Sequence, residues 1–191
     1  MADTPPERIL AAALRLFARR GYGLTSMREV AEAAGVTKPA LYYHFESKEQ
    51  LYLRVVQVQI EGLHALIAQT LQQEGSWLER VRAFAGAYVA AALVDEDALR
   101  LMLAATLPRE DGQPDVDLLA VHTRTFSTLC AVLQEGVDAG DLRSNLDLGA
   151  AAFGLVGSID MHIMAGVHGL PLPDDVAERI LDLFLQGAAP R

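Results

Sequence analysis

The stretch SMREVAEAAGVTKPALYYHF, residues 26–45, decides the fold of the N-terminal part of the chain. Its first half places apolar residues on one face of a short helix: Met27, Val30, Ala31 and Ala34. Gly35 ends that helix, where a left-handed turn residue is needed, and a second helix of barely two turns follows from Lys38 to His44. This pattern suits any helical hairpin with a glycine turn, and it predicts a helix-turn-helix once the outer face of the second helix is considered.

The second helix displays side chains that suit DNA. Leu41 and Phe45 return to the core, which leaves a lysine and aromatic rings to project outward and enter a major groove. The residues available to project outward are Lys38, Pro39, Tyr42, Tyr43 and His44. Hydroxyl, imidazole and ammonium donors that suit phosphate oxygens surround them: Thr25, Ser26, Tyr43, His44 and Lys48. Thr37, which can cap the second helix, completes the predicted DNA-binding set. The alternative for Tyr42 is a ring packed beneath the helix.

The net charge of −9 argues at first against a nucleic-acid partner, but the distribution of the charge reverses the argument. Residues 1–48 hold seven Lys/Arg and five Asp/Glu, for a balance of +2, and both lysines of the protein are among them. Residues 49–191 hold nine Lys/Arg and twenty Asp/Glu, for a balance of −11. Because DNA repels an acidic body, a DNA-binding face must be local and N-terminal.

Helix signals recur along the chain, and strand signals are absent. Capping boxes pair Thr4 with Glu7, Ser26 with Glu29, Ser47 with Gln50 and Ser76 with Glu79. A helix from Ser47 to about Gln73 is expected to connect the N-terminal module to the rest, with Gly62 as its soft point. Further helices are predicted at 76–94, 96–106, 114–139, 147–168 and 175–187. The sequence therefore predicts an all-α protein of about nine helices, divided near residue 48.

The segment from Ile9 to Tyr52 resembles the tetracycline-repressor (TetR) family. The resemblance rests on LYYHF followed by a Ser-Lys-Glu helix start, some fifteen residues after Thr-Ser-Met-Arg. It implies a helix-turn-helix DNA-binding domain of three helices at 1–48 and a helical ligand-binding and dimerisation domain at 49–191. The resemblance places Lys38, Pro39 and Tyr42 at base-facing positions. It also implies repression of target genes from a double-stranded, palindromic operator, with release when a small molecule enters the C-terminal core.

The C-terminal half matches the family only in its general layout. The helix at 147–168 is rich in Gly and Ala, which lets helices approach closely. With the final helix it looks like the pair that forms the family's dimer interface, so we expect a homodimer; the alternative is that both helices are core of the monomer.

A pocket for a mainly apolar effector, neutral or cationic, is expected among residues 76–168, although each lining residue alone could be ordinary core. The candidates are Phe84, Tyr88, Met102, His122, Phe126, Asp160, Met161 and Met164. Asp160 interrupts an apolar stretch, and a buried carboxylate there needs a partner or a ligand. It could instead face solvent or pair across the dimer.

Rival functions find little support. The sequence holds no HExxH, glycine-rich phosphate loop, CxxC or nucleophile elbow, and Cys130 is its only cysteine, so we expect no enzyme, no cofactor and no metal site. No signal peptide is recognisable and the uncharged apolar runs are shorter than a membrane span, so a cytoplasmic protein without a membrane partner is expected. A ligand-free architectural or division-control protein and a ligand-responsive activator remain as alternatives.

Overall fold

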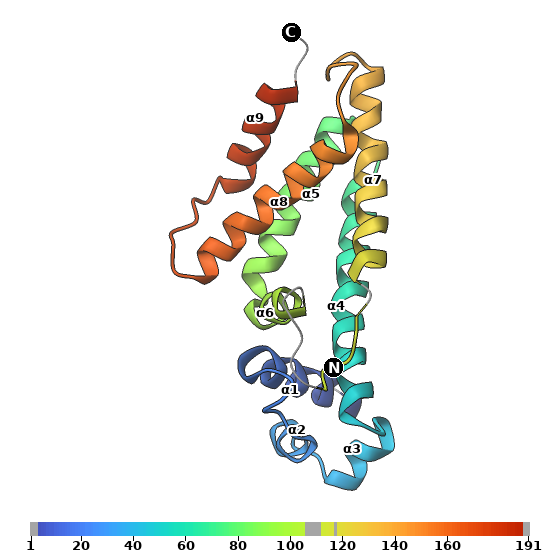
Figure 1. The fold of residues 1–191 in the computed structure, drawn as a ribbon, viewed down its shortest axis with the longest axis vertical. Helices are drawn as coiled ribbons and strands as arrows, with labels where there is room; N and C mark the ends of the chain where they lie inside the picture. Colours follow the sequence, from blue (N-terminus) through green and yellow to red (C-terminus); the bar gives the residue numbers. More distant parts are fainter. Residues whose placement is uncertain (1–3, 106–111, 117, 189–191) are drawn as a thin grey trace. The chain divides into compact units, whose positions relative to one another are not determined.

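A computed structural model describes residues 4–105, 112–116 and 118–188, except for the side chains at 118–122, 124 and 125. In this part of the chain every regular element is an α-helix, as the sequence predicts (Figure 1). The nine helices are α1 (Pro5–Arg20), α2 (Met27–Ala34), α3 (Lys38–His44), α4 (Lys48–Leu71), α5 (Trp77–Val94), α6 (Glu96–Ala105), α7 (Leu118–Asp138), α8 (Leu148–Val167) and α9 (Val176–Ala188).

The observed helix starts follow the predicted caps, with one difference in detail. Glu7 accepts hydrogen bonds from the backbone N–H and the hydroxyl of Thr4, at 2.6 and 2.8 Å. Ser47 accepts from the backbone N–H of Gln50 at 3.0 Å. The Gln50 side chain, however, accepts from the N–H of Glu46 at 2.7 Å and thereby secures the residue before the expected cap.

One helix start was predicted too early. The expected helix at 114–139 begins as α7 at Leu118, because Gln113 and Val116 contact the core of unit 1 instead. The Gln113 side chain donates to the Tyr52 hydroxyl at 2.9 Å, and Val116 packs against the core that contains Tyr52.

The chain forms two compact units, which divide it differently from the expected boundary after residue 48. Unit 1 comprises Met1–Gly62 and Asp95–Leu118, and unit 2 comprises Leu63–Val94 and Leu119–Arg191. Helix α6 belongs to unit 1 because it packs along α1 and buries Leu101 in the same core. Asp97 of α6 also accepts two hydrogen bonds from the Arg19 guanidinium of α1, at 2.8 and 3.0 Å.

Unit 1 has a buried hydrophobic core to which α1, α2, α3 and the first turns of α4 contribute. Phe17 of α1, Tyr52 of α4 and Leu41 of α3 are each at most 2% exposed. The Phe17 and Tyr52 rings meet edge to face with their centroids 5.2 Å apart, and Tyr22 contacts both rings. This core fixes the orientation of α2 and α3 relative to α1 and the first turns of α4.

Unit 2 is built on α5, which packs against α8 and α9. Helix α7 approaches the start of α5 at Gly136, where an added Cβ would lie 2.8 Å from the Trp77 ring, so only glycine fits without displacement. The Trp77 indole N–H donates to Asp141 at 2.9 Å and secures the same corner.

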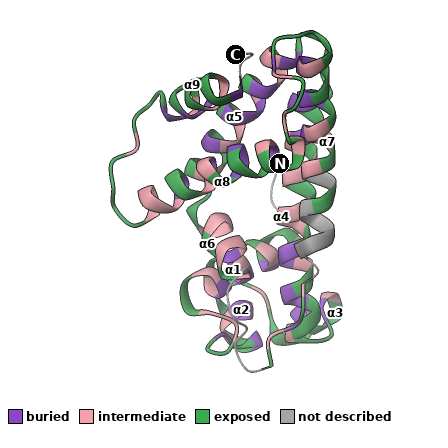
Figure 2. Cartoon of the chain, turned by 45° about the horizontal axis from the view of Figure 1, so that its top comes forward, coloured by how far each residue is buried: buried purple, intermediate pink, exposed green. Residues whose placement is uncertain are grey.

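Helices α8 and α9 carry many exposed residues (Figure 2), and some of these have large apolar side chains. Phe153, Met161 and Leu183 are 69%, 63% and 71% exposed. Among the described helices, α8 alone is long and apolar enough to cross a membrane by length and composition. One such helix is weak evidence for a span, because a core or interface helix of a soluble protein passes the same test.

Candidate nucleic-acid interface

The turn between α2 and α3 has the geometry that a helix-turn-helix requires. Gly35 adopts a left-handed backbone, with φ 63° and ψ 37°. The N–H of Val36 then returns to the Ala31 carbonyl at 3.0 Å and closes the end of α2. Ala31 is 3% exposed, and a larger side chain would hold the two helices apart. Thr37 caps α3 by accepting from the N–H of Ala40 at 3.3 Å.

Helix α3 buries one side and presents the other to solvent. Leu41 is fully buried, whereas Tyr42 is 41% and Tyr43 85% exposed. Tyr42 is thus not a ring enclosed beneath the helix. The Lys38 ammonium lies 5.7 Å from the centre of the Tyr42 ring, and Lys38 and Pro39 are exposed. The three predicted base-facing side chains therefore lie together on the outer surface of α3.

The predicted phosphate-facing residues divide into three groups, and the first group contains Ser26, Tyr43 and His44, which lie at helix ends. Tyr43 and His44 are neighbours at the end of α3, with their rings edge to face at 5.1 Å. Ser26 is exposed at the start of α2, where its hydroxyl donates to Glu29 at 2.7 Å and accepts from the Glu29 N–H at 3.3 Å. The bonds from Ser26, assisted by Arg20, lower the pKa of the Glu29 carboxyl.

Thr25 forms the second group and corrects the prediction. Its side chain is only 3% exposed, and its hydroxyl donates to the Gly21 carbonyl at 2.9 Å. The backbone N–H of Thr25 is bonded as well, to the Tyr22 carbonyl at 3.3 Å. Thr25 therefore stabilises the turn before α2 from the inside, instead of presenting a donor at the rim.

Lys48, the third group, lies elsewhere than its position at a helix start suggested. Its ammonium is 4.1 Å from the centre of the Tyr22 ring and 3.4 Å from the Gly23 carbonyl. The side chain thus reaches back to the turn between α1 and α2. This contact could not be read from the sequence, because Tyr22 and Lys48 are 26 positions apart and meet only after α1 has packed on α4.

Three of the candidate ligand-binding residues come together in unit 2. The Phe84 and Tyr88 rings of α5 are stacked with their centroids 5.6 Å apart, and the Tyr88 hydroxyl donates to Asp160 of α8 at 2.9 Å. Burial and the nearby Asp160 carboxylate raise the pKa of Tyr88. Asp160 therefore has a hydrogen-bond partner within the protein. The sequence indicates that a carboxylate buried in this apolar stretch needs either such a partner or a ligand.

The other candidates are dispersed. Met102 packs against the core of unit 1, whereas the other candidates belong to unit 2. Phe126 stacks on Phe153 at 5.8 Å, Met161 is largely exposed and Met164 is half-buried. The side chain of His122 lies outside the described residues.

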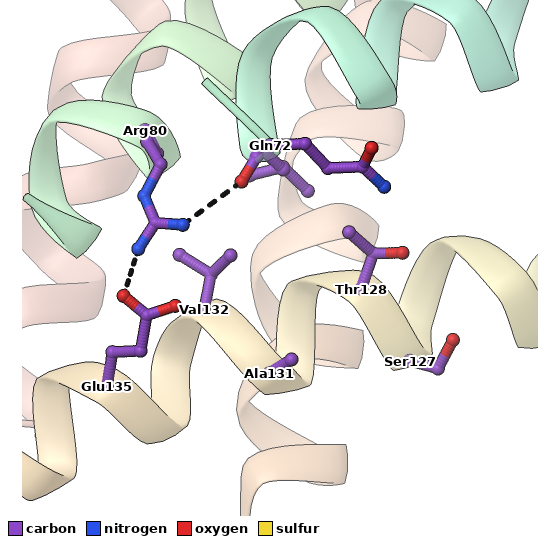
Figure 3. A pocket seen from close by; sticks show the side chains of 8 residues that line it. Gln72, Arg80, Ser127, Thr128, Ala131, Val132 and Glu135 are labelled. Atoms are coloured by element: carbon purple, nitrogen blue, oxygen red, sulfur yellow. Dashed lines mark hydrogen bonds and ion pairs between the residues drawn. The ribbon is translucent and has the colours of Figure 1, made fainter. Parts of the chain in front are cut away.

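A pocket of about 420 Å³ lies elsewhere in unit 2 (Figure 3). Its walls come from the end of α4, the start of α5 and the middle of α7: Leu71, Gln72, Arg80, Ser127, Thr128, Ala131, Val132 and Glu135. Arg80 bonds to Glu135 across one end and donates to the Leu71 carbonyl at 3.3 Å. None of the candidate residues lines this pocket, and no local sequence signal marks it, because its walls come from three separate helices.

The comparisons with known proteins agree with the geometry of unit 1. Residues 9–55 match the family described as bacterial regulatory proteins, tetR family. The transcriptional activator FasR of Mycolicibacterium smegmatis is 41% identical over 81 residues, which cover 42% of this chain and 37% of FasR. The match thus spans little more than a third of that relative's length.

Two similarities extend over most of the chain. The transcriptional repressor KstR2 of Mycolicibacterium smegmatis is 29% identical over 155 residues, or 76% of this chain and 74% of KstR2. The solved structure of the TetR family regulator PfmR from Thermus thermophilus superposes with a TM-score of 0.77 at 26% identity, covering 94% of this chain and 97% of PfmR. The helix-turn-helix of unit 1 is that of the tetR family of bacterial regulatory proteins, and the chain as a whole is similar in sequence and fold to TetR family transcriptional regulators.

Proposed function

We propose that the protein is a cytoplasmic, homodimeric regulator that binds a palindromic operator and is released by a small, mainly apolar molecule bound to unit 2. The observation that carries the DNA-binding part is the outer surface of α3, where Lys38 and Tyr42 are exposed above a fully buried Leu41. A helix of this size with a lysine and aromatic rings on its free side suits a major groove.

Within this proposal the side chains have distinct roles. Lys38, Pro39 and Tyr42 contact base edges and set the sequence preference, because they lie on the outer side of α3. Ser26, Tyr43, His44 and Lys48 hold phosphates and set the register, whereas Thr37 fixes the start of α3. Thr25 acts only through the turn that it stabilises.

The dimer forms through α8 and α9. Their uncovered apolar side chains include Phe153, Met161 and Leu183, and exposing such residues to water is costly for a monomer. Gly154 and Gly157 of α8 are also exposed, with open space around the position of a Cβ, so a partner helix can approach closely. A second copy of the same face satisfies both features, since a two-fold interface is self-complementary.

The effector site is proposed around Phe84, Tyr88 and Asp160. The two stacked rings offer apolar area, and the hydrogen-bonded Tyr88 and Asp160 are polar groups that an effector with a donor group can re-pair. The net charge of −11 over residues 49–191 favours a neutral or cationic molecule. Inhibition of DNA binding by lipophilic cations, and no response to an anionic acyl thioester, would support this choice.

Release follows if the effector and DNA favour different arrangements of the dimer. The chain passes between the units within α4 after Gly62, between Val94 and Asp95, and at the start of α7. A change in unit 2 is thereby transmitted covalently to unit 1. Because each ligand selects its own arrangement, effector and operator must weaken each other's binding by the same factor.

The test begins with genome-wide mapping of the sites that the protein binds in its host. We expect discrete palindromic sites near promoters, and operator binding that weakens when an effector is added. Broad coverage without discrete sites, or operator affinity that no effector changes, would favour the ligand-free architectural alternative. The named relatives include an activator and a repressor, so the position of the footprint relative to the promoter decides between these two directions.

A further inference from the structure

The Lys48 ammonium is held in place before any DNA arrives. It lies 4.1 Å from the centre of the Tyr22 ring and 3.4 Å from the Gly23 carbonyl, so an aromatic face and a backbone oxygen both contact it. Both groups are attractive to a cation. The other lysine of the protein, Lys38, is 5.7 Å from the centre of the exposed Tyr42 ring.

The Tyr22 ring is in turn held in place by the rings of Phe17 and Tyr52. It stacks on Phe17 at 5.9 Å and meets Tyr52 edge to face at 5.1 Å. Phe17 and Tyr52 are 2% exposed and belong to the core of unit 1. The ring that carries the Lys48 cation is therefore positioned by buried aromatic rings, and it cannot turn without disturbing the core.

The ammonium lies at the turn that leads into α2. Gly23 is three residues before Ser26, whose position at the start of α2 places it beside the N–H groups of the first helical turn. A phosphate that approaches this turn meets the Lys48 ammonium, which can donate a charge-assisted hydrogen bond to it. The geometry points to Tyr22 as a positioning residue, which holds the Lys48 ammonium at the turn before α2 so that it engages a DNA phosphate.

This inference rests on the proposed DNA binding. It explains part of the affinity for DNA by the ordering of the Lys48 side chain before DNA binds. A lysine side chain has several rotatable bonds, and ordering it on DNA costs entropy. When the Tyr22 ring has ordered the side chain beforehand, DNA binding no longer bears that cost. Tyr22 should then influence affinity without changing sequence preference, because a phosphate contact is the same at every sequence.

The contact can be tested in the protein alone by NMR with isotope-labelled lysine. Because the chain has only Lys38 and Lys48, each lysine resonance can be assigned with one substitution. The ring of Tyr22 should displace the side-chain resonances of Lys48 upfield more strongly than the ring of Tyr42 displaces those of Lys38. Tyr22→Phe should keep the displacement of Lys48 and Tyr22→Leu should remove it. Equal, unshifted resonances for both lysines would overturn the inference.

The predicted effect of Tyr22 on DNA affinity is tested by a double-mutant cycle with Lys48. The affinity is measured for a non-specific DNA duplex, so the operator need not be known. Tyr22→Leu should lower affinity about two- to fivefold, the range for an exposed cation–π contact, and leave the salt slope unchanged. Lys48→Met should reduce the salt slope by about one, because one phosphate contact is lost. In the Lys48→Met background, Tyr22→Leu should have no further effect.

The matched control is Phe45→Leu, which removes a buried ring from the core of unit 1 outside the cluster of Phe17, Tyr22 and Tyr52. It should lower thermal stability without any coupling to Lys48. An equal effect of Tyr22→Leu in both backgrounds would mean that the ring is only structural. If Tyr22→Leu does not fold, Tyr22→Phe and the wild-type lysine spectrum still decide the matter. Failure of the wild type to bind duplex DNA would refute the proposed function instead, whatever the spectrum shows.

Discussion

The two compact units differ in the kind of surface that they leave uncovered. The tyrosines on α3 of unit 1 are exposed, and each carries a hydroxyl that water or DNA can satisfy. In unit 2 the exposed large apolar residues on α8 and α9 are Phe153, Met161 and Leu183, whose side chains carry no hydrogen-bond donor. The surface of α3 therefore suits a partner that binds reversibly, whereas the apolar surface of α8 and α9 suits a permanent partner.

The difference between the two surfaces is tested most strongly by a charge placed on the exposed apolar face of α8 and α9 in unit 2. Gly157→Glu and Leu183→Glu should each yield monomers, because both positions are exposed in the monomer and a dimer would bury the new charge in an apolar interface. Operator affinity should fall by about 10²–10⁴-fold, since the second half-site is no longer linked to the first. Light scattering and operator titration measure the two effects.

The control for this pair is Gly86→Glu on α5, which also has open space around the Cβ position. It should leave the dimer intact. A monomeric wild type at micromolar concentration, or an unchanged dimer in both charged variants, would contradict the assignment of α8 and α9.

The next prediction concerns the outer surface of α3 in unit 1. Lys38→Ala and Tyr42→Ala should each weaken operator binding by about 1–3 kcal/mol and relax the preference at particular base pairs. Binding to non-specific DNA should change much less. A comparison of affinities for operators with single base substitutions measures the effect. Lys38→Ala with unchanged affinity and preference would show that this residue does not face the bases.

Two glycines, one in each unit, test the packing that supports the two surfaces. Gly136→Ala should lower the free energy of unfolding by about 1–3 kcal/mol, because the new methyl group would be overpacked against the Trp77 ring. Gly35→Ala should cost about 1 kcal/mol, because φ is 63° there and the space around it is open. Gly86→Ala, in open space on a helix, should be neutral or slightly stabilising. Denaturant unfolding ranks the three variants, and a reversed order would contradict the account.

The smallest effect is expected at the junction of the units. Gly62 lies within α4 at the division between unit 1 and unit 2, and a Cβ there meets nothing within 4 Å. Gly62→Ala should stiffen the helix and leave operator affinity nearly unchanged. The ratio of operator affinities with and without effector should shift instead. If that ratio matches the wild type, bending at Gly62 takes no part in the release.

The sequence alone predicted unit 1 well because its structure is determined locally. Gly35 at a left-handed turn, Ser26 at a helix start and Leu41 on a buried face each follow from neighbours within a few positions. The inclusion of α6 in unit 1 was missed, because it depends on Leu101 and Asp97 meeting α1 across about eighty residues. Thr25 was misassigned because a hydroxyl before a helix start can face either way.

Unit 2 was predicted in its helices but not in its candidate site. The apolar residues were identified, yet their helical spacing does not say which of them meet. Phe84, Tyr88 and Asp160 came together, whereas Met102 joined the core of the other unit. The pocket beside Arg80 and Glu135 depends on the relative positions of three helices, which no short motif encodes.

The most direct test of the central claim is a chemical footprint of the wild-type protein on an operator obtained by mapping. Two recognition helices of one dimer should protect two major-groove patches, related by two-fold symmetry and about 34–36 Å, or a whole multiple of that, apart. Tyr42→Ala should weaken the protection of both patches equally. A single protected patch without a symmetric partner, or protection confined to the minor groove, would contradict the claim that paired copies of α3 bind this DNA.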